Sequence, residues 1–440
     1  MADHADLSPE KMQVVVLMGG LGTRLRGAVG ELPKAMAPVV GKPFFRHQLD
    51  LLKLYGFRKF LFLIGHGGGA VRGYFGNGRK FGVRIGYSDE GFRPLGTLGA
   101  LRRALPSLEK DFALIYGDSF MDVNYRELVY AYEAARRDER KMLMAVLHNR
   151  GRSGPSNVVY REGGIVVYDK KRHHSGMEYI DYGVSLISRD VVRRIRPGHP
   201  CDLARLYGPL ARKGLVAGHP VGNRFYEIGS PASLEECAAY LGRRALRHPA
   251  VFLDRDGVLN AIVPNSETGS PDSPLDVGEV RILPRAAKAL AILRKKGYLL
   301  IVVTNQPAAA KGKATLEQLA AINGAVREKL ASAGALLDDL LMCPHHPAGS
   351  PGTRHPSLIG RCRCRKPSPG LLRLAARKWR IDIGRSYMVG DSPADILAAG
   401  RFGVRSVFVG NCRCDTDRLL AGRKPDIIAA DLYEFAKRAG

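Results

Sequence analysis

One short stretch limits the fold of this chain more than any other. An apolar segment, residues 251–253, runs into Asp254, and Asp256 and Gly257 follow directly. Side chains two positions apart in an extended segment point the same way, so we expect Asp254 and Asp256 to face one phosphate or one cation together. The alternative is a turn or helix cap, which also favours Asp after a strand. A carboxylate attacks a phosphate only when a metal ion and a cationic side chain mask the charge.

Such helpers follow in order along the chain. A second apolar run ends at Thr304, Lys366 supplies a cation, and a third apolar run ends in Gly390, Asp391 and Asp395. The ordered set Asp-x-Asp-Gly, Thr, Lys and Gly-Asp-x-x-x-Asp resembles the haloacid-dehalogenase (HAD) superfamily of phosphatases. Four motifs in this order, each expected at a strand end, favour a phosphatase over an isolated turn.

The resemblance implies a role for each residue. Asp254 would be the nucleophile that takes the phosphoryl group, and Asp256 would protonate the leaving oxygen and later deprotonate water. Thr304 and Lys366 would hold the transferring phosphate. Mg²⁺ would be bound by Asp254, Asp391 and the backbone carbonyl of Asp256.

Four metal-binding side chains precede Lys366 in the sequence. They are two cysteine- or histidine-containing pairs separated by a loop: Cys343, His345, Cys362 and Cys364. Four nitrogen and sulfur donors suit a closed structural Zn²⁺ site, and the alternative is a set of free thiols. The arrangement resembles the heptose-bisphosphate phosphatases and the related histidinol-phosphate phosphatases. In that group the zinc loop shapes the substrate entrance in place of a large cap domain.

The resemblance also implies contacts to the sugar phosphate by Asn305, Lys311 and Arg365. The family usually has a Ser/Gly-containing turn ending in Arg-Gly, whereas this chain has Pro-Ala-Ala-Ala before Lys311 and Gly312. Lys311 keeps the positive charge but lacks the planar two-pronged donor of arginine.

A second signature lies near the beginning of the chain. An apolar strand is followed by a glycine loop that contains Gly19, Gly20, Gly22, Thr23 and Arg24. Glycines let backbone N–H groups approach a phosphate closely. The loop is neither a Walker loop nor a complete dinucleotide fingerprint. With its continuation over residues 31–43, it strongly resembles the sugar-1-phosphate nucleotidyltransferases, over most of residues 13–240.

This second resemblance implies the residues of a nucleotidyl-transfer site. The nucleoside triphosphate would be held by Gly19, Gly20, Gly22, Thr23, Arg24 and Lys34. The base and sugar pocket would include Gly96, Thr97 and Gly99, and Lys170 would hold the sugar phosphate. A second Mg²⁺ would lie between Asp118 and Glu227, while Arg24 and Lys34 neutralise charge during transfer. The family more often has Asp at the position of Glu227 and Pro at that of Ala35.

The boundary between the two signatures lies around residues 241–249. We predict an α/β protein with two Rossmann-like three-layer domains, each built on a parallel sheet. Residues 1–243 would form a nucleotidyltransferase domain of GT-A-like fold. Residues 249–440 would form a HAD-like phosphatase domain with a zinc loop and no large cap.

Charge and composition limit the partners. The formal net charge is +26, yet no basic run or RNA-binding aromatic motif stands out, so we interpret the charge as diffuse rather than as a nucleic-acid site. No apolar run is long enough to span a membrane. We expect a cytoplasmic enzyme with small-molecule partners, namely sugar phosphates and a nucleoside triphosphate, whereas the sequence does not indicate the oligomeric state.

Together the halves predict a bifunctional enzyme of nucleotide-activated heptose synthesis. The phosphatase half would remove the 7-phosphate from heptose 1,7-bisphosphate, and the other half would transfer a nucleotidyl group to heptose 1-phosphate. Resemblance to heptose-1-phosphate guanylyltransferases favours guanine as the base. The alternatives are another sugar, histidinol phosphate as the phosphatase substrate, or one half acting as a non-catalytic regulatory module that binds nucleotide sugar.

Overall fold

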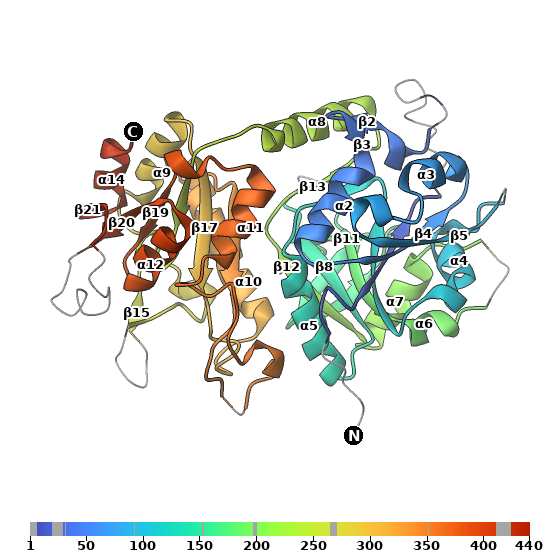
Figure 1. Ribbon diagram of the computed structural model, residues 1–440. Helices are drawn as coiled ribbons and strands as arrows, with labels where there is room; N and C mark the ends of the chain where they lie inside the picture. The colour runs from blue at the N-terminus through green and yellow to red at the C-terminus, as the bar shows by residue number, and fades with distance from the viewer. Residues whose placement is uncertain are drawn as a thin grey trace. The chain divides into compact units, whose positions relative to one another are not determined.

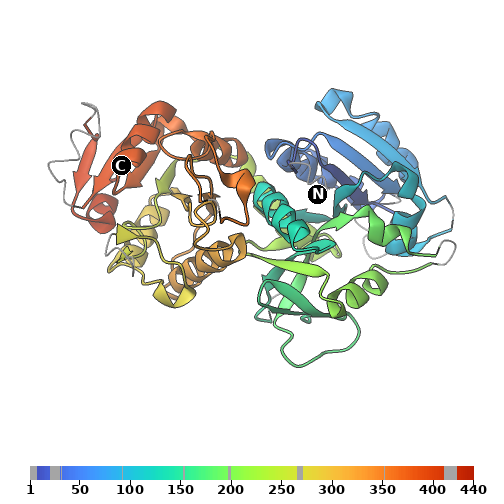
Figure 2. The same ribbon diagram turned by 90° about the horizontal axis from the view of Figure 1, so that it is seen from below.

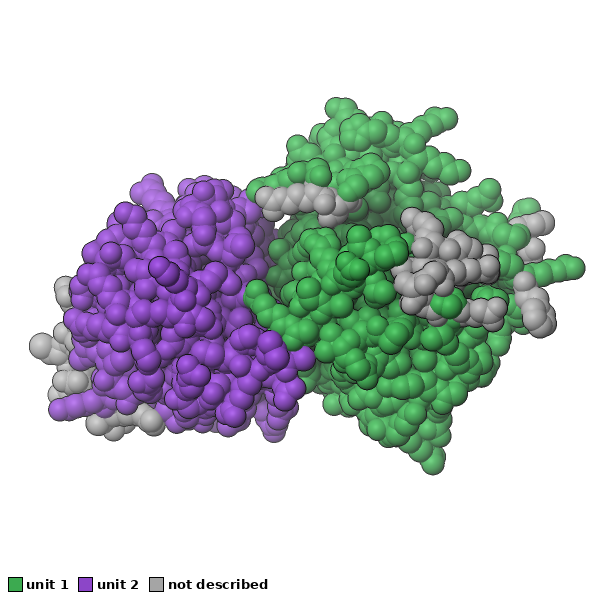
Figure 3. Space-filling view, turned by 90° about the horizontal axis from the view of Figure 1, so that it is seen from above, with its two compact units in different colours: residues 1–243 green, residues 244–440 purple. Residues whose placement is uncertain are grey.

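The structure is a computed structural model, and it describes residues 7–19, 30, 32–91, 93–151, 154–196, 200–264, 271–350, 352–410 and 424–440. The chain divides into two compact units, residues 1–243 and 244–440, coloured green and purple in Figure 3. We call them the N-terminal and C-terminal units. None of the described helices is long and apolar enough to cross a membrane.

The N-terminal unit is built on a nine-stranded sheet of order β5-β4-β1-β6-β11-β8-β12-β10-β9. Four neighbouring strands of this sheet are parallel: β1 (Gln13–Leu17), β4 (Lys59–Ile64), β5 (Arg84–Asp89) and β6 (Asp111–Tyr116). The other strands are β8 (Met142–His148), β9 (Val158–Arg161), β10 (Gly164–Tyr168), β11 (Tyr179–Ser188) and β12 (Val216–Val221). Strands β1, β4 and β6 are mostly apolar and buried, as expected for strands that are covered on both faces, whereas β5 lies at the edge of the sheet and is more polar.

The sheet of this unit is parallel only in part, which the alternation of strands and helices in the sequence did not indicate. Strand β11 runs antiparallel to both β6 and β8. The physical reason is that β8, β9, β10 and β11 follow one another without an intervening helix. A parallel return needs a crossover of a dozen or more residues, which short turns cannot provide.

Helices cover both faces of this sheet (Figures 1 and 2). Apolar side chains of α4 (Gly96–Arg103), α6 (Arg189–Arg193) and α7 (Ala204–Arg212) join strand residues in one buried cluster. The remaining α-helices among the described residues of this unit are α2 (Phe44–Leu54), α3 (Gly68–Phe75), α5 (Tyr125–Arg137) and α8 (Pro231–Ala245). A two-stranded ribbon pairs β7 (Ser119–Met121) with β13 (Phe225–Glu227).

The C-terminal unit has a six-stranded sheet of order β18-β17-β14-β19-β20-β21, in which every pairing is parallel. Its strands are β14 (Ala250–Leu253), β17 (Leu299–Asn305), β18 (Asp339–Cys343), β19 (Tyr387–Gly390), β20 (Arg405–Val409) and β21 (Ile427–Ala429). The part of this unit that the structure describes has the α-helices α9 (Ala286–Lys295), α10 (Leu316–Ser332), α11 (Gly370–Trp379), α12 (Pro393–Phe402) and α14 (Leu432–Arg438). The predicted α/β class is therefore confirmed.

Strand order determines where a ligand can bind in each unit. In the C-terminal unit the chain moves from β14 to β17 and β18, then crosses to β19 on the other side of β14. In the N-terminal unit it moves from β1 to β4 and β5, then crosses to β6 on the other side of β1. Right-handed crossovers that reverse direction leave a crevice at the carboxyl ends of the two central strands. These crevices lie after β14 and β19 in one unit and after β1 and β6 in the other.

Candidate active sites

The crevice of the C-terminal unit brings three carboxylates and one lysine together. Asp254 follows β14, and Asp391 and Asp395 follow β19. The Lys366 Nζ lies 2.9 Å from Asp254 Oδ1 and 2.6 Å from Asp395 Oδ1, and the lysine is only 2% exposed. The buried ammonium group of Lys366 stabilises the carboxylates of Asp254 and Asp395. Asp391 forms no ion pair with a cationic side chain among the described residues.

Two glycines allow the carboxylates to approach this closely. Gly257 has a φ of +77°, and a Cβ there would lie 1.9 Å from Asp391 Oδ2. A Cβ on Gly390 would lie 2.1 Å from Asp395 Cγ. Neither position therefore accepts a side chain while the acids hold these positions.

The donor set fits a hard divalent cation. Oxygens of Asp254, Asp391 and Asp395 all lie within 4.8 Å of one another. Burial raises the pKa of Asp254 to about 6, opposed by Lys366, and burial with the neighbouring acids raises that of Asp391 to about 7. Mg²⁺ prefers carboxylate oxygens, and an added positive charge would offset the surplus of negative charge.

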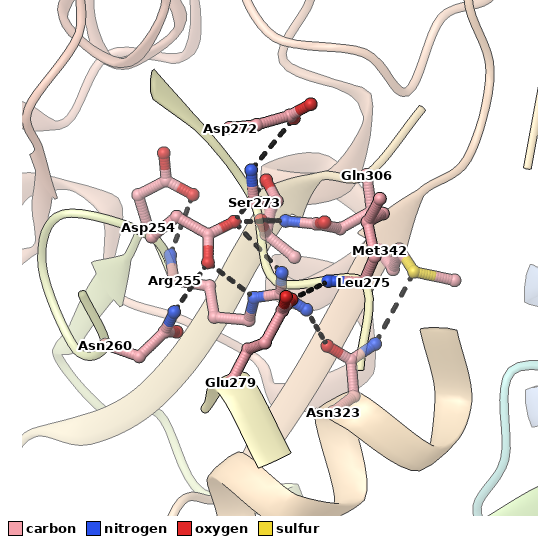
Figure 4. A network of polar contacts seen from close by, with 12 residues as sticks. Asp254, Arg255, Asn260, Asp272, Ser273, Leu275, Glu279, Gln306, Asn323 and Met342 are labelled. Atoms are coloured by element: carbon pink, nitrogen blue, oxygen red, sulfur yellow. Dashed lines mark hydrogen bonds and ion pairs between the residues drawn. The ribbon is translucent and has the colours of Figure 1, made fainter. Parts of the chain in front are cut away.

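The Asp256 carboxylate accepts hydrogen bonds from four side chains that are labelled in Figure 4, among them Arg255. Both of its oxygens accept from Arg255, whose Nε and Nη2 lie 3.1 and 3.0 Å away. Burial alone would raise the pKa of Asp256, but the Arg255 guanidinium and further hydrogen bonds lower it. The pKa-lowering bonds come from Asn260 at 2.7 Å and Gln306 at 2.6 Å, and Ser273 also donates to Asp256 at 2.8 Å.

Residues at the end of β17 form hydrogen bonds around the two predicted phosphate ligands, Thr304 and Lys366. Thr304 Oγ1 accepts from Gln306 Nε2 at 2.9 Å. The Asn305 side chain donates to the Lys366 carbonyl at 3.1 Å and accepts from the Lys366 N–H at 3.0 Å. This reciprocal pair fixes the backbone that carries the buried lysine. Lys311 lies farther along, on an exposed turn.

The four predicted zinc ligands form one cluster. Cys343 ends β18, and its Sγ lies 3.6 Å from Cys362 Sγ, 3.2 Å from Cys364 Sγ and 3.7 Å from His345 Nδ1. Corners of a tetrahedron around Zn²⁺ with Zn–S bonds of about 2.3 Å lie about 3.8 Å apart. The separations fit such a site. Arg365 Nη1 donates to the His345 carbonyl at 3.2 Å, which connects this predicted sugar-phosphate ligand to the loop.

The crevice of the N-terminal unit is a cavity of about 350 Å³. Lys34 and Asp118 line it, and Lys34 Nζ lies 2.9 Å from Asp118 Oδ2. Glu227 is exposed at the end of β13 opposite Ser119, and the next residue, Ile228, donates its N–H to the Asp118 carbonyl at 2.9 Å. Asp118, in the turn before β7, therefore lies beside the end of β13 that carries Glu227.

Several predicted nucleotide contacts also line the cavity. Gly19, Gly96 and Thr97 do so, whereas Gly99 lies one turn into α4. Gly96 has a φ of +70°, and a Cβ there would lie 2.6 Å from the Cys201 carbonyl oxygen. Four predicted residues lie outside the described residues: Gly20, Gly22, Thr23 and Arg24.

Lys170 is exposed after β10, and its charge acts on a half-buried acid that the sequence did not suggest. Burial raises the pKa of Asp181, and the Gly183 N–H and Lys170 oppose this. Asp181 also accepts from Tyr168 at 3.3 Å. No local motif marks Asp181, because its neighbours come from distant strands.

Comparison with known families agrees with this division. The "Nucleotidyl transferase" model matches residues 13–154, and the "HAD-hydrolase-like" model matches residues 363–435. A D-glycero-beta-D-manno-heptose-1,7-bisphosphate 7-phosphatase of Rhodopseudomonas palustris is 34% identical over 160 residues, which cover 36% of this chain and 82% of the relative. A relative of the same description from Mesorhizobium japonicum is 36% identical over 183 residues, which cover 40% of this chain and 79% of the relative.

Solved structures resemble each unit. The D,D-heptose 1,7-bisphosphate phosphatase of B. bronchiseptica, complexed with magnesium and phosphate, is 30% identical and covers 43% of this chain and 97% of its own, with a TM-score of 0.35. HddC of Yersinia pseudotuberculosis, complexed with GMP-PN, is 20% identical and covers 52% of this chain and 99% of its own, with a TM-score of 0.44.

Proposed function

Through its C-terminal unit the chain belongs to the D-glycero-beta-D-manno-heptose-1,7-bisphosphate 7-phosphatase family, and from this membership we propose a bifunctional enzyme of nucleotide-activated heptose synthesis. The C-terminal unit removes the 7-phosphate from heptose 1,7-bisphosphate. The N-terminal unit transfers GMP from GTP to the resulting heptose 1-phosphate and releases pyrophosphate. The observation that carries the proposal is one chain that matches both a phosphatase family and a nucleotidyltransferase model.

In the phosphatase reaction, Asp254 attacks phosphorus and forms an aspartyl phosphate, while Asp256 donates a proton to the leaving sugar oxygen. Asp256 then takes a proton from the water that hydrolyses the aspartyl phosphate. Lys366 and Thr304 hold the phosphoryl oxygens. Mg²⁺, held by Asp254, Asp391 and the Asp256 carbonyl, would reduce the negative charge on the phosphoryl group.

In the nucleotidyl transfer, an oxygen of heptose 1-phosphate attacks the α-phosphate of GTP. Lys34 stabilises the charge that develops on the phosphates, and Arg24 assists it. Asp118 and Glu227 would hold a second Mg²⁺, which would orient the triphosphate. On this proposal Lys34 moves from Asp118 to the phosphates when GTP binds. Lys170 holds the acceptor phosphate.

The Cys343, His345, Cys362 and Cys364 cluster binds a structural Zn²⁺ in this proposal. The four donors fill a tetrahedral shell, so the ion has no open position for catalysis. The loop lies beside Lys366, and Arg365 and Lys311 border the sugar. We place the enzyme in the cytoplasm, where nucleoside triphosphates are available.

A coupled reaction tests the proposal directly. Purified protein is incubated with Mg²⁺, each anomer of heptose 1,7-bisphosphate and each nucleoside triphosphate, and products are identified by mass spectrometry. GDP-heptose should form from GTP and one anomer. Asp118→Asn should abolish nucleotide-sugar formation but retain phosphate release, and Asp254→Asn should stop phosphate release while transfer to supplied heptose 1-phosphate continues.

Three results would contradict parts of this proposal. Faster hydrolysis of histidinol phosphate or of another sugar phosphate than of the heptose substrate would reject the heptose assignment. Phosphate release without any nucleotide sugar, even from supplied heptose 1-phosphate, would make the N-terminal unit a regulatory module. Loss of both activities in either variant would indicate coupled sites or misfolding.

A further inference from the structure

Tyr240 of α8 contacts both strands of the ribbon that β7 and β13 form. Its ring stacks on Tyr226 of β13, with the ring centroids 4.5 Å apart and the ring planes at 23°. Its hydroxyl group donates to Asp122 Oδ2 at 2.7 Å, and Asp122 follows β7 directly and is 1% exposed. The Tyr240 ring centroid also lies 6.1 Å from that of Phe120 on β7. One side chain therefore connects both strands to the helix.

The opposite face of the ribbon carries an acid that we propose as a ligand of the second Mg²⁺. Across the ribbon, Tyr226 pairs with Phe120, and Glu227 pairs with Ser119. Successive side chains of a strand point to opposite faces. Because the Tyr226 and Phe120 rings face α8, Glu227 faces away from it. Asp118 precedes Ser119, so packing of α8 on one face of the ribbon fixes the strand ends beside both proposed ligands.

The ribbon is too short to hold its position alone. Each of its strands has three residues, and an isolated pair of strands is at most marginally stable in water. Strand β7 has a further anchor, because the Met121 N–H donates to Gln48 Oε1 at 2.8 Å. On β13, the residue before Glu227 is Tyr226, whose ring is stacked on Tyr240. The position of the Glu227 backbone therefore depends on this stack.

Two further contacts tie the chain around Glu227 to α8. Ser233 Oγ, in the first turn of α8, accepts from the Gly229 N–H at 3.0 Å. Arg224, directly before β13, forms an ion pair with Glu236 of α8, in which Nη2 lies 2.7 Å from Oε2. The segment is thus connected to the helix both before and after Glu227.

From these contacts we infer that Tyr240 is a positioning residue of the nucleotidyl-transfer site: it holds β13 so that Glu227 stays beside Asp118. The inference rests on the proposed transfer and on its second Mg²⁺. Glu227 is exposed and the Asp118 side chain is 28% exposed, so a cation can reach both carboxylates, which are donors that Mg²⁺ prefers. Replacing a residue that orients such a ligand typically lowers metal affinity about 10- to 100-fold.

Binding of GTP by the intact protein, with Mg²⁺ and with EDTA instead, tests this inference by isothermal titration calorimetry. In Tyr240→Leu the affinity with Mg²⁺ should fall about 10- to 100-fold, whereas the affinity in EDTA should stay that of the wild type. Tyr240→Phe keeps the ring and should recover most of the affinity. Tyr226→Leu removes the same stack from the strand, so it should behave like Tyr240→Leu. The two leucine changes together should weaken binding no more than either alone.

Tyr74→Leu is the matched control, because Tyr74 lies on another helix of the same unit, α3, and its ring stacks on that of Phe81 with the planes at 24°. Thermal unfolding should show that it loses stability as Tyr240→Leu does, but it should bind GTP with Mg²⁺ as the wild type does. If Tyr240→Leu does not fold, Tyr226→Leu makes the same comparison at a half-buried position.

Two results would overturn the inference and leave the proposed transfer standing. One is an unchanged affinity for GTP with Mg²⁺ in the leucine variants. The other is an equal loss of affinity with Mg²⁺ and in EDTA, because a general packing defect would weaken both. A wild type that binds no GTP under either condition would reject the inference and the proposed transfer together.

Discussion

Arg255 and Asn323 are buried partners in the C-terminal unit: Arg255 Nη1 donates to Asn323 Oδ1 at 2.8 Å (Figure 4). The two residues are 68 positions apart in the sequence. The same fully buried guanidinium holds both carboxylate oxygens of Asp256. Helix α10, which carries Asn323, therefore orients the proposed general acid through a single arginine.

Replacing Asn323 with Leu should leave Arg255 Nη1 without its acceptor. We expect a loss of about 1–3 kcal/mol in the free energy of unfolding. Because Asp256 acts in the chemical step, we also expect phosphatase kcat to fall about 10-fold with little change in KM. Asn323→Asp keeps an acceptor and should recover most of the rate. A variant that is less stable but equally fast would show that the contact is only structural.

Lys366→Met should be damaging for stability as well as for activity. The substitution leaves Asp254 and Asp395 buried without their shared cation, and removing one partner of a buried ion pair costs about 3–5 kcal/mol. Phosphate release should fall below detection. The double variant Lys366→Met, Asp395→Asn removes one of the two stranded charges, so thermal unfolding should show partial recovery of stability. Activity should remain absent in that variant, and its return would reject the role of Lys366.

Gly257→Ala should abolish phosphate release, because its Cβ would overlap Asp391 Oδ2 at 1.9 Å. Gly297→Ala is the matched control. Gly297 also has a positive φ, +88°, but a Cβ there meets nothing within 4 Å. Backbone strain should lower the free energy of unfolding of both variants by about 1–2 kcal/mol. Only Gly257→Ala should lose activity, and equal activity of the two variants would contradict the close approach of Asp391.

Metal analysis of the purified protein should find one Zn²⁺ per chain. Cys364→Ser should lower this content severalfold and reduce the unfolding temperature of the C-terminal unit, because binding energy of a structural Zn²⁺ is also folding energy. Cys201→Ser serves as the control, since Cys201 belongs to the N-terminal unit and lies outside the cluster. Full zinc content in Cys364→Ser would remove Cys364 from the ligand set.

The sequence predicted the candidate sites wherever a motif ends a strand. We could expect Asp254, Thr304 and Asp391 to lie near one another, because each follows or ends a strand and parallel strands place their carboxyl ends at one edge of a sheet. The clustering of Cys343 with Cys362 followed from ligand spacing, which depends little on the fold.

Partners contributed by distant elements could not be predicted in this way. Asn323 lies in the middle of α10 without a motif, and only the packing of that helix brings it to Arg255. Asp181 is an ordinary acid in the sequence, and only the fold brings Tyr168 to within 3.3 Å of its carboxylate. The antiparallel β11 was missed because alternating apolar runs indicate strands but not their direction.

The crevices where strand order reverses have an evolutionary consequence. Asp118 and Asp391 both lie on segments that leave the sheet, whereas the folding core consists of the strands beneath them. Substitutions on such segments change which ligand is accepted at little cost to folding. Divergence of substrate preference among descendants of this chain should therefore concentrate at a few strand-end positions, while the buried strands change slowly.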